Sequence, residues 1–343
     1  MRSFLTILLA STAAAVAPLQ PVATWPLTSL APRGNLSKFD HLLVDASTGL
    51  LYVSGKAINV LIAVDMTSGR VAKTLDLASP QGLVVSKEGQ LWVGSDEGGN
   101  LTAVDRAAFT AAHTLFFTDD TDDIHLDAVS GSLFVSSGDA ATGGAAGGQA
   151  MIVEVTPDVR APVVRAINLF PAHVEGFALV PGTPFIVAST PDVNQVHVLD
   201  KNTHAIKATW AVPAPLAGVT PLLFDNATQT VVAVARTPGA LIVFDFAAGG
   251  KVLTQVPCEC GDADDVWLDA ASKTVFVTSG AVAGEYTASV TAFRQVARDT
   301  YTILGQNRPA GKTSTFDSKR GLLYTAVPDT GAGASIQVYG LAA

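Results

Sequence analysis

Residues 39–65 read FDHLLVDASTGLLYVSGKAINVLIAVD, and this stretch contains the pattern that decides the fold. One short apolar segment ends at Asp45, a second runs from Leu51 to Gly55, and a third ends at Asp65. The segments are rich in Val, Ile and Leu, whereas Gly, Asp, Asn, Ser and Thr fill the breaks. This is typical of short strands joined by tight turns.

The same pattern occurs seven times along the chain. Its spacing of about 40–55 residues indicates a repeat architecture, and units made only of strands favour a propeller. A fourth, outer strand follows most copies, as in residues 70–75. The sequence therefore predicts an all-β, seven-bladed β-propeller that forms one domain over residues 18–343. The first strand of each copy ends at a recurring position: Asp45, Ser86, Asp127, Pro181, Asp225, Asp269 and Asp317.

The seventh copy lacks its outer strand, because only four residues follow Tyr339. Residues 22–27, VATWPL, resemble the outer strand at residues 207–212, KATWAV. A propeller must pair its terminal strands or leave an edge exposed. We therefore expect residues 22–27 to complete the last blade, with Pro26 at an edge where it costs no ladder hydrogen bond.

The first 17 residues predict a secretory signal peptide: a basic start, a short apolar core and a run of small residues. We therefore expect the secretory pathway or the extracellular space. No other apolar run is long enough for a membrane span. The net charge of −9 argues against nucleic-acid binding. We expect small apolar or aromatic substrates as partners, and a monomer or homodimer.

Two further features fit a secretory route. Three sequons are candidate N-glycosylation sites, at Asn35, Asn100 and Asn226. Cys258 and Cys260 are the only cysteines, and an oxidising compartment favours a local disulfide between them. Free thiols, or a redox or metal role, are the alternatives.

Candidate functional residues lie at the starts of the innermost strands, which are expected to meet at one mouth of the central channel. G-x-S-x-G, P-loop, G-x-G-x-x-G and H-E-x-x-H motifs are absent. Chemistry is therefore expected from side chains that the ring assembles. Those singled out are Asp40, His41, Gln81, Asp122, Asp123, His125, His173, Glu175, Thr220, Asp264, Asp265, Trp267, Thr313 and Ser314.

Three interpretations of this mouth compete. The acids could accept backbone hydrogen bonds and join the blades. Carboxylates from several blades could instead bind Ca²⁺, which takes six to eight oxygen ligands. The proposed calcium ligands are Asp40, Asp123, Glu175 and Asp265.

The third interpretation is a metal-free pocket without a cofactor, in which polar side chains supply protons and aromatic ones an apolar wall. Its predicted catalytic residues are His41, Asp123, His125, Glu175 and Asp265. Its predicted substrate-binding residues are Phe39, Gln81, Phe177, Trp267 and Ser314.

The repeat resembles the secreted seven-bladed propellers of the YVTN/lactonase-like group. Leu51-Tyr52-Val53-Ser54, residues 61–65 with Thr67-Ser68-Gly69, Leu91-Trp92-Val93 and the Asp-Asp pairs carry the resemblance, which covers essentially the whole mature chain. Lactonases and related hydrolases of this fold generally use an axial divalent cation.

In size and architecture the chain also resembles the hetero-Diels–Alderases of fungal tropolone–sesquiterpenoid pathways. That resemblance implies coupling of a tropolone-derived o-quinone methide with a humulene-type alkene, in a pocket that holds both partners in a near-attack arrangement. A divalent-cation-dependent lactonase-like hydrolase and a non-catalytic ligand-binding propeller are the alternatives.

Overall fold

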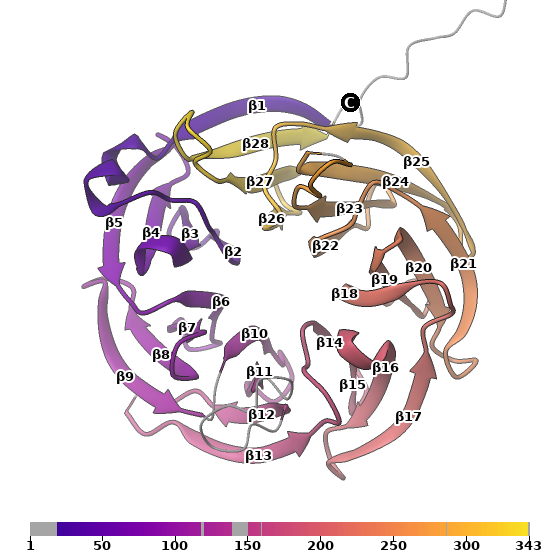
Figure 1. The fold of residues 1–343 in the computed structure, drawn as a ribbon. Helices are drawn as coiled ribbons and strands as arrows, with labels where there is room; N and C mark the ends of the chain where they lie inside the picture. Colours follow the sequence, from indigo (N-terminus) through magenta and orange to yellow (C-terminus); the bar gives the residue numbers. More distant parts are fainter. Residues whose placement is uncertain (1–18, 118–119, 139–149, 159, 286, 342–343) are drawn as a thin grey trace, which may run out of the picture.

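The computed structural model describes residues 19–117, 120–138, 150–158, 160–285 and 287–341. Seven four-stranded antiparallel sheets are arranged as blades around a central axis (Figure 1). The prediction of a seven-bladed propeller is confirmed. The predicted signal peptide, residues 1–17, lies outside the described residues.

The strands of each blade follow one another from the channel outward (Figure 1). Blades one to four comprise β2 (Leu42–Asp45), β3 (Leu50–Gly55), β4 (Val60–Asp65), β5 (Arg70–Asp76); β6 (Pro80–Val85), β7 (Leu91–Ser95), β8 (Asn100–Asp105), β9 (Thr110–Phe116); β10 (Thr121–Leu126), β11 (Leu133–Ser137), β12 (Met151–Thr156), β13 (Val163–Leu169); β14 (Phe177–Leu179), β15 (Phe185–Thr190), β16 (Gln195–Asp200) and β17 (Ala205–Ala211). Blades five to seven comprise β18 (Ala217–Asp225), β19 (Thr230–Thr237), β20 (Gly239–Asp245), β21 (Lys251–Pro257); β22 (Ala263–Asp269), β23 (Thr274–Ser279), β24 (Ser289–Ala297), β25 (Thr300–Asn307); β26 (Ser314–Asp317), β27 (Leu322–Val327), β28 (Ser335–Leu341) and β1 (Leu19–Pro26).

Three short 3-10 helices complete the described secondary structure: η1 (Thr28–Arg33), η2 (Lys56–Ile58) and η3 (Pro191–Val193). Within the described ranges, no helix has the length and apolar character that a membrane crossing requires.

The N-terminal strand closes the ring, as predicted. β1 pairs antiparallel with β28, from Leu19 opposite Leu341 to Pro26 opposite Ser335. The strand begins three residues before the predicted segment, and a register shift near Pro21 interrupts its ladder. As the outermost strand of blade seven, β1 leaves its prolines at an edge, where a missing N–H breaks no second ladder.

The hydrophobic core lies between the blades. The described residues form seven clusters of buried apolar side chains, one at each of the seven interfaces between neighbouring blades. Each blade is therefore buried on both faces, which explains why strands such as β4 and β7 are apolar at nearly every position.

Acids at the turn after the innermost strand join adjacent blades. Asp45 accepts a hydrogen bond from Arg106 of blade two. Lys201 of blade four donates to Asp127 of blade three at 2.7 Å. These anchor acids join blades through side-chain partners. Backbone hydrogen bonds between blades, as expected for the acids at the starts of the inner strands, are present at Asp265, which accepts from Ser314 N–H, and at Asp123, which accepts from Phe177 N–H.

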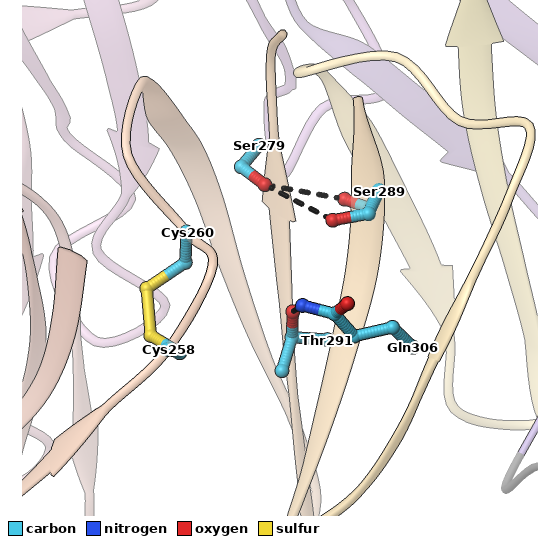
Figure 2. Close-up of a disulfide and its surroundings, with 6 residues drawn as sticks. All are labelled: Cys258, Cys260, Ser279, Ser289, Thr291 and Gln306. Atoms are coloured by element: carbon cyan, nitrogen blue, oxygen red, sulfur yellow. Dashed lines mark hydrogen bonds between the residues drawn. A yellow bond between two sulfur atoms is a disulfide. The ribbon is translucent and has the colours of Figure 1, made fainter. Parts of the chain in front are cut away.

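Cys258 and Cys260 form a disulfide in the connection between β21 and β22 (Figure 2). Cys260 is fully buried and packs in the cluster between blades five and six. The sequon residues Asn35 and Asn226 are exposed, whereas Asn100 is half-buried at the start of β8.

Candidate functional site

A cavity of about 1370 Å³ occupies the centre of the ring. Residues of all seven innermost strands line it. The starts of these strands meet at one end, which we call the polar mouth. Its ionisable lining residues include Asp40, His41, Lys56, Asp122, Asp123, His125, His173, Glu175, Asp264, Asp265 and Lys312.

The structure brings most of the predicted site residues to this cavity. The ones that line it are Asp40, His41, Gln81, Asp123, His125, Glu175, Phe177, Asp265 and Trp267. The fold explains their convergence, because each precedes or belongs to an innermost strand and these strands are arranged around one axis (Figure 1).

Two predicted substrate-binding residues lie elsewhere, and these predictions need correction. Phe39 is 2% exposed and packs between blades one and seven. Ser314 is 1% exposed, and its hydroxyl accepts a hydrogen bond from Trp267 Nε1 at 2.9 Å. Side chains alternate between the channel and the blade interface along a strand. Phe39 thus belongs to the core, and Ser314 orients Trp267.

His41 lies among carboxylates from three blades. Its Nε2 is 3.3 Å from Asp122 Oδ1 and 3.6 Å from Asp40 Oδ1, and its Nδ1 is 3.9 Å from Asp265 Oδ1. Burial alone would lower the pKa of His41, but the hydrogen bond with Asp122 and the charges of Asp40, Asp122 and Asp265 raise it well above its usual value. A protonated imidazole therefore occupies the centre of the polar mouth.

The carboxyls around His41 are shifted as well. Burial raises the pKa of Asp265 to about 7, although the charge of His41 opposes the shift. Burial likewise raises the pKa of Asp40 to about 6, again against the charge of His41. Ser314 N–H donates to Asp265 Oδ2 at 2.6 Å, which leaves Oδ1, facing His41, as the oxygen able to carry a proton.

His125 and Asp123 form a dyad on β10. His125 Nε2 is 2.9 Å from Asp123 Oδ2, and the imidazole packs edge-on against Phe177 with 4.5 Å between ring centroids. Burial would raise the pKa of Asp123, but the charge and hydrogen bond of His125 lower it, so the carboxylate stays ionised. No hydrogen bond joins His125 Nδ1 to the rest of the described chain. The carboxylate orients the ring, and in the neutral imidazole that donates Nε2–H to Asp123, the Nδ1 lone pair is available to accept a proton.

A chain of charges joins blades four to seven. Glu175 contacts His173 at 2.9 Å and Arg236 at 3.2 Å. Arg236 also contacts Asp264 at 2.7 Å, and Asp264 contacts Lys312 at 2.9 Å. Burial would raise the pKa of Glu175, but these partners outweigh it and bring that pKa down to about 2. Glu175 is thus a fixed anion in an ion-pair network rather than a proton donor.

The side-chain amide of Gln81 also forms hydrogen bonds with neighbouring groups. Its amide nitrogen donates to Asp120 at 3.0 Å and to Asp122 at 2.7 Å, while its carbonyl oxygen accepts from Lys56 at 2.6 Å. Because these bonds already engage both ends of the amide, Gln81 acts as a bridge between blades one to three. The expectation that it binds substrate directly is not supported by this geometry.

The sequence interpretation missed three cations that pair with acids at the polar mouth: Lys56, Arg236 and Lys312. Lys56 follows the second strand of blade one, and Arg236 lies near the end of the second strand of blade five. A second strand runs antiparallel to the first, so it ends at the mouth where the first begins. Lys312 stands two residues before β26. All three could have been found from the sequence, because they lie at the ends of second strands or just before an innermost strand.

The donors that could share a metal ion differ from the predicted calcium set. Among the described residues, Asp40, His41 and Asp122 are the group whose ligand atoms lie within 4.8 Å of one another. Only Asp40 belongs to both sets. Two carboxylates and one imidazole are a poor match to the six to eight oxygens of Ca²⁺, and the raised pKa of His41 opposes metal binding at its nitrogen.

Comparison with known proteins identifies the fold alone. The chain matches no protein-family model and no curated protein. Among solved structures it is similar to a chain of hydrazine synthase from Kuenenia stuttgartiensis, with a TM-score of 0.73, 13% identity, and coverage of 88% of this chain and 95% of that one. A chain of the mitotic checkpoint complex gives a TM-score of 0.73 at 13% identity, with coverage of 100% and 99%.

The β-propeller domain of Cps50 (Swd1) from Myceliophteria thermophila gives a TM-score of 0.69 at 12% identity, with coverage of 95% and 100%. At such low identity these likenesses support a propeller and carry no activity to this chain.

Proposed function

We propose that the protein is an enzyme of fungal secondary metabolism, acting in the secretory pathway or outside the cell, that couples a tropolone-derived o-quinone methide to a humulene-type sesquiterpene alkene. The observation that carries the proposal is one cavity in which proton-transfer groups directly adjoin apolar walls. The proton-transfer group His125 lines it, and so do the apolar side chains of Leu126, Trp267 and Leu268. The resemblance to fungal hetero-Diels–Alderases points to the same chemistry.

The size of the cavity supports a reaction of two substrates. Pockets for one drug-sized ligand enclose about 300–1000 Å³. The present cavity, at about 1370 Å³, exceeds that range. Holding two partners together in an oriented pair converts a bimolecular coupling into an effectively unimolecular step.

The proposed first step is formation of the quinone methide from a hydroxymethyl tropolone, with Asp265 as acid and His125 as base, both of which line the cavity. Asp265 Oδ1 gives a proton to the hydroxymethyl oxygen, the C–O bond breaks, and water leaves. His125 Nδ1 removes the proton of the ring hydroxyl, whose electrons form the new carbonyl. One proton is given and one is taken, so the step balances without an oxidant or reductant.

The second step needs orientation rather than covalent participation. The four π electrons of the quinone methide and the two of the alkene form one C–C and one C–O bond, which closes a dihydropyran ring. The protonated imidazole of His41 donates a hydrogen bond to the quinone methide oxygen and so polarises the diene. The apolar walls hold the alkene against its reactive face.

A lactonase-like hydrolase is the second candidate, favoured by the Asp40–His41–Asp122 donor group. The hydrolase is the weaker candidate, because two of the predicted calcium ligands already have hydrogen-bond or ion-pair partners. Asp123 is bonded to His125, and Glu175 to His173 and Arg236. A cation would have to displace these partners to recruit further ligands.

The test is to incubate purified protein with a hydroxymethyl tropolone and humulene and to follow the adduct by chromatography and mass spectrometry. We expect a rate above the buffer reaction, a drop of about 100-fold or more in His125→Gln, and no change in His113→Gln, a control on the outer strand β9. Full activity in His125→Gln would remove the dyad from the mechanism. No acceleration by wild-type protein, together with lactone hydrolysis that chelation abolishes, would replace the proposal by the hydrolase.

A further inference from the structure

The central cavity has two chemically different halves. Beyond the polar mouth, each blade contributes one or two half-buried apolar side chains from the second half of its innermost strand. We call this ring the apolar collar: Leu43, Val44, Val84, Leu126, Leu179, Leu223, Phe224, Leu268 and Phe316.

The apolar collar contains no charged side chain, although charges dominate both ends of the cavity. At the polar mouth, Lys56, Arg236 and Lys312 contact the acids of other strands. At the far mouth, Asp127 is neutralised by Lys201 at 2.7 Å. A section that offers water no partners is favourable for an apolar ligand, because the displaced water gains hydrogen bonds elsewhere.

The cavity also continues past the ends of the inner strands. Its lining includes the turns at residues 128–130 and 181–184, which follow β10 and β14. Val129 is 83% exposed in the first turn, and Pro181 and Pro184 belong to the second. At this rim Val129 and the two prolines lie in the same lining as the Asp127–Lys201 ion pair. A hydrocarbon that entered here would pass that ion pair, whereas one that passed the polar mouth would have to desolvate several ion pairs.

We propose that the apolar collar is a separate binding site for a neutral hydrocarbon of terpene class, which reaches it through the far mouth past Val129. The inference rests on the proposed function, because it assigns the alkene to the apolar collar and the tropolone partner to the polar mouth. The two substrates then meet at His125 and Trp267, which precede the collar residues Leu126 and Leu268.

The test measures binding without requiring the reaction. N-phenyl-1-naphthylamine, a neutral apolar fluorophore, is titrated into the full-length purified chain, and humulene is then added as competitor. Two variants probe the path: Val129→Asp at the exposed rim and Leu268→Asn in the apolar collar. Val163→Asp is the matched control, because Val163 is 54% exposed on the outer strand β13. Circular dichroism confirms that each variant is folded.

We expect humulene to displace the fluorophore and Leu268→Asn to weaken its binding about tenfold or more, which corresponds to about 1.4 kcal/mol. We expect Val129→Asp to slow association, with Val163→Asp unchanged. If humulene does not compete, or if both variants match wild type, the collar site is wrong. His125→Gln separates the two proposals: normal binding with lost coupling supports both, whereas normal binding by a wild-type protein that couples nothing overturns only the proposed reaction.

Discussion

Closure of the ring can be tested at Gly69, in the turn between β4 and β5. A Cβ at this position would lie 2.3 Å from Cδ1 of Trp25, the indole of the closing strand β1. Such an approach is far inside van der Waals contact. The backbone at Gly69 is also left-handed, with φ +67°. Gly69→Ala therefore combines backbone strain with a clash against the strand that completes blade seven.

Gly49 provides a matched control in the same blade. Its φ is +72°, and an added Cβ would meet nothing within 4 Å. Alanine in a left-handed conformation costs about 1–2 kcal/mol, and both variants carry that cost. Overpacking adds about 1–3 kcal/mol, and only Gly69→Ala carries it. We expect losses of about 1–2 kcal/mol for Gly49→Ala and about 2–5 kcal/mol for Gly69→Ala.

Urea unfolding followed by far-ultraviolet circular dichroism measures both losses. A double-mutant cycle with Trp25→Ala isolates the clash, because the extra cost of Gly69→Ala should disappear once the indole is removed. Equal losses for the two glycine variants, or an unchanged extra cost in the Trp25→Ala background, would refute the packing of β1 against this turn.

Three further predictions concern charge. In the proposed mechanism Asp265 is the acid, and its pKa is raised to about 7, so we expect the coupling rate to fall as the pH rises through about 7 and Asp265→Asn to remove that fall; a flat wild-type profile would contradict the role. Burial would lower the pKa of His173, but Glu175 raises it to about 9 from a usual value of 6.5. The stability that this shift contributes is complete below pH 6.5 and lost as the pH rises through 9, so urea midpoints of wild type and His173→Gln should converge between these values; a constant gap would count against the ion pair. Lys201→Met removes the ammonium group that lies 2.7 Å from Asp127 Oδ2, and we expect this variant to unfold at a lower temperature than wild type. Lys87→Met, at an exposed position, is the control and should change the unfolding temperature little.

The repeat could be predicted from the sequence because it depends on local pattern. Seven copies of short apolar strands separated by turn residues fix the number of blades, and the missing last strand fixes how the ring closes. The likeness between residues 22–27 and 207–212 also has a physical basis. Trp210 packs against Gly250 as Trp25 does against Gly69, with a Cβ at Gly250 lying 2.1 Å from the indole.

The candidate site was predictable only in part. The prediction from ring position was right in placing His41, Asp123 and His125 at the cavity, because the order of the strands determines where each inner strand begins. It failed for Phe39 and Ser314, which lie beside the channel but point into the core. The direction of a side chain at the very start of a strand depends on local twist and bulges, which the sequence pattern does not specify.

The sequence by itself determined the architecture, the order of the blades and most, but not all, of the residues that meet on the axis. Only the tertiary structure decided which of those residues already form ion pairs or hydrogen bonds with one another. Glu175 becomes a fixed anion because Arg236, 61 residues away in the chain, lies 3.2 Å from it. Burial raises the pKa of Asp265 to about 7, although the charge of His41 opposes the shift. Ionisation depends on distance and burial in three dimensions, whereas sequence pattern records only which residues are available.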